Sequence, residues 1–165
     1  MDATHWSVAI ITPHRYDAQL IADLLRNANV PRPRIFADGE AALAYAAQTA
    51  VDVLITALDA KPNDGLAWVM ALRRSRASRS RQAAVFLLTR TLTPSVAEAC
   101  RRAGANAVIG LPVSGSTLMG TITKVLAKPR PFVEADGYVG PCRRAGIVTA
   151  GAGSRRRRTD RVDAA

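Results

Sequence analysis

The sequence predicts an α/β protein with a doubly wound, parallel five-stranded sheet covered by helices on both faces. Short apolar β-forming runs alternate with segments of helical periodicity five times in about 125 residues. The central run, VLITAL over residues 53–58, is apolar throughout, which is typical of a strand buried on both faces. Gly, Pro, Asn and Asp separate most of these segments, as expected for turns.

The first two strand–helix pairs are defined by apolar runs and by the residues that end them. Residues 7–11 form a short strand that stops before Pro13, because proline removes a donor from the ladder. Residues 17–28 have apolar side chains at helical spacing. A proline-containing break precedes a second strand over residues 34–37, and Asp38 and Gly39 then turn the chain into an Ala-rich helix over residues 40–48.

The other three pairs start at the central strand. A turn over residues 61–65 follows it, and Asp64 is a candidate N-cap for a helix over residues 66–74. A basic connection over residues 73–82 holds five arginines and leads to a fourth strand over residues 84–89. Thr93 and Pro94 start the next helix and Gly104 ends it. A fifth strand over residues 107–109 and an amphipathic helix over residues 116–127 complete the domain.

From Lys128 the periodic pattern fails. Prolines and glycines interrupt residues 128–165, and the sequence RRRR follows a Gly-Ala-Gly-Ser segment. We therefore expect two regions, a folded domain over residues 1–127 and a largely disordered basic tail over residues 128–165. The domain carries 14 Lys and Arg against 9 Asp and Glu, whereas the much shorter tail carries 9 against 4. This surplus of positive charge suggests an anionic partner.

The composition favours a soluble, cytoplasmic protein. No apolar run approaches the roughly 18 to 20 residues that span a bilayer, and the first residues lack the features of a signal peptide. Cys100 and Cys142 are too far apart for a disulfide scaffold and lack metal-ligand spacing to either histidine, so we expect free thiols in a reducing compartment. The sequence suggests no Ser-His-Asp or Cys-His arrangement and no Gly-rich phosphate loop, so we expect no enzymatic activity.

The stretch VDVLITALDAKPNDGL, residues 51–66, resembles the third strand and following loop of CheY-like response-regulator receiver domains, which typically read D-L-V-L-L-D-x-x-M-P-x-M-D-G-L. The resemblance implies the flavodoxin/CheY-like form of the doubly wound fold. Counting forward from Asp52 or back from Gly65, the phospho-accepting Asp of the family falls on Ala57. A methyl group cannot form an acyl phosphate.

The other reactive positions of the family are also mostly changed. The two acidic residues that hold Mg²⁺ after the first strand correspond to Thr12 and Pro13, so we expect no Mg²⁺. The Lys that precedes a Pro after the fifth strand corresponds to Leu111, and the switching aromatic residue corresponds to Val108. Only the hydroxyl after the fourth strand is retained, as Thr89. The resemblance therefore implies a degenerate pseudo-receiver.

Two other residues could take over the phosphoryl group. Asp59 lies two residues beyond the expected acceptor, and His14 lies at the mouth of the vacated site, where an imidazole could carry phosphate or titrate near neutral pH. A solvated loop carboxylate and an ordinary loop histidine are the alternative interpretations.

The arginines of the tail are the strongest positive feature. Arginine presents a planar fork to phosphate and guanine and stacks on bases. Residues 131–144 resemble tails of some receiver-only bacterial proteins, and some CheY-like proteins with arginine-rich tails bind cyclic di-guanylate. A solvated charge run, or contact with nucleic acid or an acidic membrane, would use the same side chains. The candidates for an anionic ligand are Arg143, Arg144, Arg155, Arg156, Arg157, Arg158 and Arg161.

The sequence thus predicts an atypical receiver that works by binding proteins without being phosphorylated. The family's interaction surface is its fourth helix, fifth strand and fifth helix, here the region Thr93 to Ala127. The expected partners are two-component or chemotaxis-type signalling proteins. The alternatives are an effector of cyclic di-guanylate or another anion, and a receiver phosphorylated at Asp59 or His14.

Overall fold

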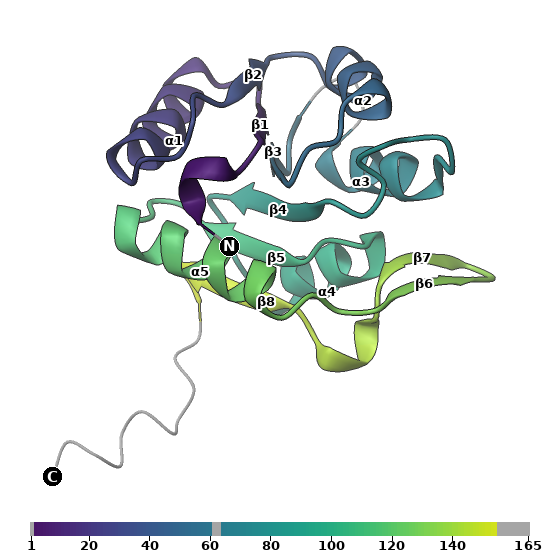
Figure 1. Cartoon of the computed structure of the whole chain (residues 1–165). Helices are drawn as coiled ribbons and strands as arrows, with labels where there is room; N and C mark the ends of the chain where they lie inside the picture. Colours follow the sequence, from purple (N-terminus) through teal and green to yellow (C-terminus); the bar gives the residue numbers. More distant parts are fainter. Residues whose placement is uncertain (1, 61–63, 155–165) are drawn as a thin grey trace, which may run out of the picture.

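A six-stranded parallel sheet forms the centre of the molecule (Figure 1). The structure is a computed structural model that describes residues 2–60 and 64–154. The strand order is β2-β1-β3-β4-β5-β8. These strands are β1 (Val8–Ile11), β2 (Arg34–Phe36), β3 (Val53–Ala57), β4 (Ala84–Thr89), β5 (Ala107–Gly110) and β8 (Val148–Gly151).

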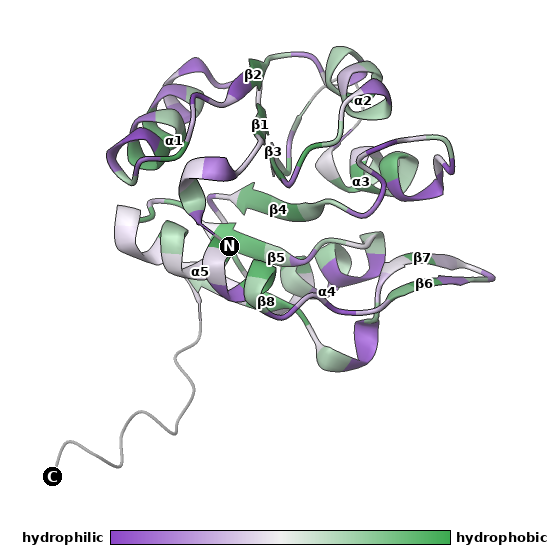
Figure 2. Cartoon of the chain, in the orientation of Figure 1, coloured by the Kyte–Doolittle hydropathy of each residue, from purple (hydrophilic) through white to green (hydrophobic). Residues whose placement is uncertain are grey.

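Five helices cover the two faces of the sheet. They are α1 (Arg15–Asn27), α2 (Gly39–Gln48), α3 (Gly65–Arg74), α4 (Pro94–Ala103) and α5 (Gly115–Ala127). Side chains of α1 and α5 pack into one core, and those of α2, α3 and α4 into a second core on the opposite face. Figure 2 shows β4 and β5 as hydrophobic between these layers. None of the helices in the described part of the chain is long and apolar enough to cross a bilayer.

The five predicted strand–helix pairs and the doubly wound fold class are confirmed. β3, β4 and β5 are buried along their whole lengths, as the continuous apolar runs predict. The predicted caps also form, since Asp64 Oδ1 accepts a hydrogen bond from Ala67 N (2.8 Å) and Thr93 Oγ1 accepts one from Val96 N (3.2 Å). Gly104 ends α4 with a φ of 105°.

The structure corrects two predictions: the sheet has six strands where five were expected, and residues 132–151 of the tail expected to be disordered contain regular structure, while residues 155–165 lie outside the described residues. β6 (Phe132–Ala135) and β7 (Tyr138–Pro141) form an antiparallel hairpin, and β8 then pairs in parallel with β5 as the sixth strand. A 3-10 turn, η2 (Arg143–Ala145), separates β7 from β8. The glycines that suggested flexibility are turn positions, since Gly137 and Gly146 have φ values of 82° and 77°.

One buried and two partly buried arginines attach this C-terminal segment to the rest of the fold. Arg73 is fully buried, and its guanidinium lies 5.8 Å from the centre of the Phe132 ring; that of Arg81 lies 5.0 Å from the same ring. Arg130 donates to the carbonyl oxygens of Cys142 (3.2 Å) and Asn106 (3.2 Å). The basic connection over residues 73–82 is therefore partly a docking site for the chain's own C-terminal segment.

Candidate functional site

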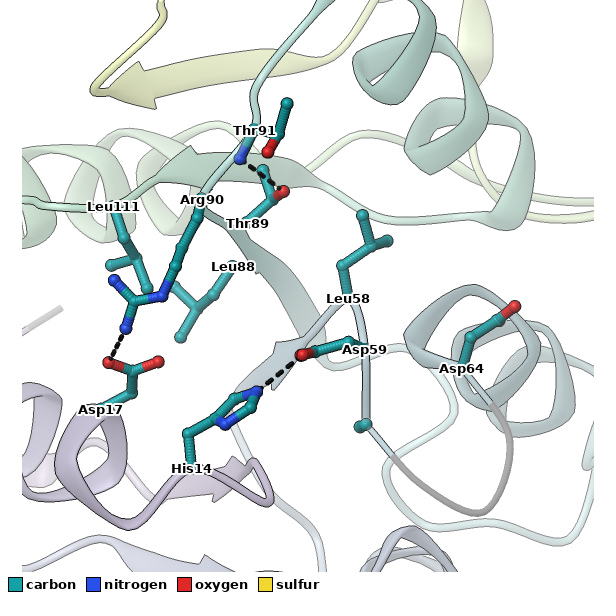
Figure 3. A pocket seen from close by; sticks show the side chains of 11 residues that line it. His14, Asp17, Leu58, Asp59, Asp64, Leu88, Thr89, Arg90, Thr91 and Leu111 are labelled. Atoms are coloured by element: carbon teal, nitrogen blue, oxygen red, sulfur yellow. Dashed lines mark hydrogen bonds and ion pairs between the residues drawn. The ribbon is translucent and has the colours of Figure 1, made fainter.

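A cavity of about 500 Å³ opens at the carboxyl edge of the sheet, where α/β proteins commonly bind ligands (Figure 3). The loops after β1, β3 and β4 supply its walls. The residues that line it are His14, Asp17, Leu58, Asp59, Ala60, Asp64, Leu88, Thr89, Arg90, Thr91 and Leu111.

Ala57 ends β3 beneath this cavity, and its side chain is a buried methyl group. Gly65 packs directly against it, because a Cβ on Gly65 would lie 2.4 Å from the carbonyl oxygen of Ala57. Gly65 N also donates to the carbonyl of Leu58 (2.8 Å). This close approach leaves no room for a side chain at position 65, which explains the glycine after Asp64. The residue that it packs against, Ala57, is the apolar last residue of β3.

The loop after β1 does not provide ligands for a hard cation. Thr12 is buried, and its hydroxyl accepts a hydrogen bond from His14 N (3.1 Å), while Pro13 has no polar side chain. Mg²⁺ prefers carboxylate and water oxygens in octahedral geometry. Nowhere in residues 2–60 and 64–154 do three His, Cys, Asp or Glu side chains gather as a metal site requires. The residues at the family's metal positions therefore do not fit Mg²⁺.

The ends of β4 and β5 carry one hydroxyl and one aliphatic side chain. Thr89 Oγ1 accepts a hydrogen bond from Thr91 N (3.1 Å), so it stabilises a local turn. Leu111, which also lines the cavity, donates from its backbone N–H to the carbonyl of Thr89 (2.8 Å). Val108 is fully buried within β5. Leu111 therefore gives the cavity an uncharged, aliphatic side chain.

A hydrogen bond between two loops and an ion pair between a loop and α1 cross the cavity mouth (Figure 3). His14 Nε2 lies 2.6 Å from Asp59 Oδ2, with both side chains largely exposed. Arg90 Nη2 lies 2.5 Å from Asp17 Oδ1, and this carboxylate is buried, with 7% of its side chain exposed. The structure thus brings together His14 and Asp59, the two alternative acceptors. Because solvent screens the exposed contact between His14 and Asp59, it contributes little to the free energy of folding, and its main effect is to orient the two side chains.

Sequence reasoning missed the pair of Arg90 and Asp17. The two residues are 73 positions apart, and Asp17 looked like an ordinary first-turn acid of a helix. Only the parallel arrangement, which brings the ends of β1 and β4 to one edge, could have suggested their proximity.

The predicted anion-binding arginines do not line this cavity. Arg143 and Arg144 lie on η2, where both are exposed, and the Arg143 guanidinium lies 4.3 Å from the centre of the Tyr138 ring. Arg155, Arg156, Arg157, Arg158 and Arg161 lie outside the described residues, as do residues 61–63 of the predicted turn.

Comparison with known proteins gives structural matches only, since no family model and no curated protein matches the sequence. The chemotaxis response regulator CheY4 of Vibrio cholerae superposes with a TM-score of 0.66 at 23% identity, over 73% of this chain and 98% of that one. A response regulator from Chloroflexus aurantiacus gives 0.69 at 24% identity, over 74% and 98%. The receiver domain of a sensor histidine kinase from Pseudomonas aeruginosa, whose active-site cleft coordinates magnesium, gives 0.67 at 19% identity, over 74% and 98%.

Proposed function

We propose that this chain, which has the fold of CheY-like response-regulator receiver domains, is a signalling module that binds its partners without being phosphorylated. The single observation that carries the proposal is Ala57 at the end of β3, where receivers of this fold carry the phospho-accepting Asp. The methyl group has no oxygen with which to attack phosphorus.

The surroundings of Ala57 support the same conclusion. The family's acid pair is replaced by Thr12 and Pro13, and the family's Lys by Leu111, so among the described residues these three positions offer neither carboxylates for a metal ion nor an ammonium group for a transferring phosphoryl group. Val108, in the place of the switching aromatic residue, is fixed inside β5. With no phosphoryl-driven rearrangement, the protein presents one constant surface to two-component or chemotaxis-type partners.

The surface expected for partner binding, Thr93 to Ala127, differs from the expectation in one respect. β8 pairs with β5 along its whole length, from Ala107 with Val148 to Gly110 with Gly151. The chain's own C-terminal segment therefore covers the edge of β5, and the surface at this end of the sheet consists of α4, β8 and α5.

The test is to add beryllofluoride or acetyl phosphate with Mg²⁺ and follow the amide spectrum of the protein. We expect the amide signals of Thr89 and its neighbours to stay where they are. The Asp59→Ala and His14→Ala variants test the alternative hypothesis, in which one of these two residues accepts the phosphoryl group. Shifts around Thr89 that disappear in either variant would replace the proposal with that alternative.

A second candidate function is binding of cyclic di-guanylate or a related anion near η2. It is favoured by the exposed Arg143 and Arg144 and by the stacking of Arg143 on Tyr138, an arrangement that could also receive a guanine base. Isothermal titration should give saturable heat that the Arg143→Ala/Arg144→Ala double variant abolishes. A tail variant with alanine at positions 155–158 would show whether those arginines take part, and the absence of heat from the unmodified protein would remove this candidate.

A further inference from the structure

β8 leaves one edge of the main sheet without a neighbouring strand. β8 is the last strand in the sheet order, and among residues 2–60 and 64–154 no other strand pairs with its outer side, where Ser154 N donates to the Gly151 carbonyl (3.2 Å). Val148 N and Ala152 N donate to β5-side carbonyls, those of Asn106 (3.4 Å) and Gly110 (2.9 Å). Because successive N–H groups of a strand point in opposite directions, the N–H groups of Thr149 and Gly151 face outward.

This edge lacks the protection found at the opposite edge of the sheet. There, β2 is three residues long, follows Pro31 and Pro33, and begins with the exposed Arg34. Prolines, charges and short length are the usual ways in which proteins prevent further strand pairing. β8 reads Val-Thr-Ala-Gly, with neither charge nor proline, so its outer side is free to accept another strand.

Two hollows flank β8, one beside each covering helix. The larger, about 580 Å³, lies between β8 and the start of α5 and is lined by Pro112, Ser114 and Thr117. The smaller, about 190 Å³, lies between β8 and the start of α4 and is lined by Leu92, Pro94 and Ala97. α4 and α5 cover opposite faces of the sheet, so alternate side chains of an added strand would point into different hollows.

The charged residues next to β8 in the sequence are of one sign. Residues 137–159 contain six arginines and no Asp or Glu. Arg143 and Arg144 are exposed just before β8, and Arg155 to Arg158 follow it in the sequence. Such a surface attracts an acidic partner and repels a second copy of this basic chain, whose formal net charge is +10.

We propose that the outer edge of β8 binds an acidic, extended segment of a partner protein by strand addition. The main-chain N–H groups of Thr149 and Gly151 would provide hydrogen bonds, the hollows would hold alternate side chains, and Arg143 and Arg144 would attract the acidic residues. The inference deepens the binding role proposed above and rests on it; the amide-spectrum test of phosphorylation is a separate measurement and can fail independently.

Fluorescence anisotropy with a labelled short peptide of alternating Glu and Val tests the proposal on the full chain. Two control peptides accompany it, one with Lys in place of Glu and one with alternate backbone amides N-methylated. We expect saturable binding of the acidic peptide and at least about tenfold weaker binding of both controls, because each lacks one of the two interactions.

Protein variants locate the binding edge. Thr149→Pro removes an outward N–H without taking a hydrogen bond from the pair with β5, and should weaken binding about tenfold, whereas Thr149→Ala, which keeps the N–H, should not. Arg143→Glu/Arg144→Glu should weaken binding similarly. Arg32→Glu/Arg74→Glu is the matched control: it makes the same charge change at exposed positions away from β8 and should have little effect.

Equal binding of the Glu and Lys peptides, equal binding of the N-methylated peptide, or equal loss in both charge-reversed pairs would overturn the proposal. Sedimentation velocity tests whether a second copy of the chain, and not an acidic partner, binds to this edge. A dimer that disappears in Thr149→Pro would assign the edge to a second copy of the chain, and would also overturn it. If Thr149→Pro disturbs folding, the N-methylated peptide still decides the case.

Discussion

Replacing Arg73 by Met removes the charged centre of the network that joins α3, β5 and the C-terminal segment. The guanidinium donates to the carbonyl oxygens of Gly104 (3.1 Å), Arg81 (2.7 Å) and Ala83 (2.8 Å), and to Asn106 Oδ1 (2.9 Å). Hydrogen bonds from a charged donor contribute about 1.5 to 3 kcal/mol each, so four independent bonds would contribute about 6 to 12 kcal/mol.

The four bonds share one side chain, so their contributions are not additive and the loss is smaller than this sum. Burial lowers the pKa of the Arg73 guanidinium to about 10, so it remains charged at neutral pH. The expected loss in the free energy of unfolding is about 4 kcal/mol.

Urea denaturation followed by far-ultraviolet circular dichroism measures this loss. With a slope of about 2 kcal/mol per molar urea, the midpoint of Arg73→Met should fall by about 2 M. Arg74→Met, at the exposed neighbouring position, should stay within about 0.5 kcal/mol of the unmodified protein. If the two variants unfold at the same urea concentration, the buried network does not stabilise the fold as argued.

Two further predictions concern packing. Gly65→Ala should destabilise the protein by about 2 to 4 kcal/mol, because its Cβ would lie 2.4 Å from the carbonyl oxygen of Ala57. Gly120→Ala should stabilise the protein by about 0.5 to 1 kcal/mol, because this helical position has open space around it. Thermal melts that rank the two variants in the opposite order would refute this prediction. Burial raises the pKa of the Cys100 thiol to about 11, so at pH 8 iodoacetamide should modify the partly exposed Cys142 first, and peptide mass spectrometry showing early labelling of Cys100 would contradict its burial.

The sequence was sufficient to predict the core of the fold because each element has a strong local signal. The uniform apolar runs at β3 and β4 and the caps Asp64 and Thr93 required no knowledge of distant contacts. The same holds for Ala57, whose place at the end of β3 follows from counting along one strand and its loop.

The C-terminal segment could not be predicted in this way, because its stability comes from contacts far apart in the sequence. β8 is only four residues long and has no alternation, and its pairing depends on Gly110, where a Cβ would lie 1.7 Å from the carbonyl oxygen of Ala152. The Phe132 ring lies against the guanidinium groups of Arg73 and Arg81, and nothing in the basic connection that holds these arginines indicates a contact about 50 residues away. At the candidate site, the pairing of His14 with Asp59 likewise depends on two loops meeting at one sheet edge.

Intact-protein mass spectrometry after incubation with acetyl phosphate and Mg²⁺ tests most directly whether the chain has lost the receiver phosphorylation reaction. Ala57 has no oxygen to accept phosphate and Leu111 has no charge to stabilise it. We therefore predict a single, unmodified mass for the unmodified protein and for Asp59→Ala and His14→Ala. A labile phosphoryl adduct on the unmodified protein that either variant eliminates would contradict the account.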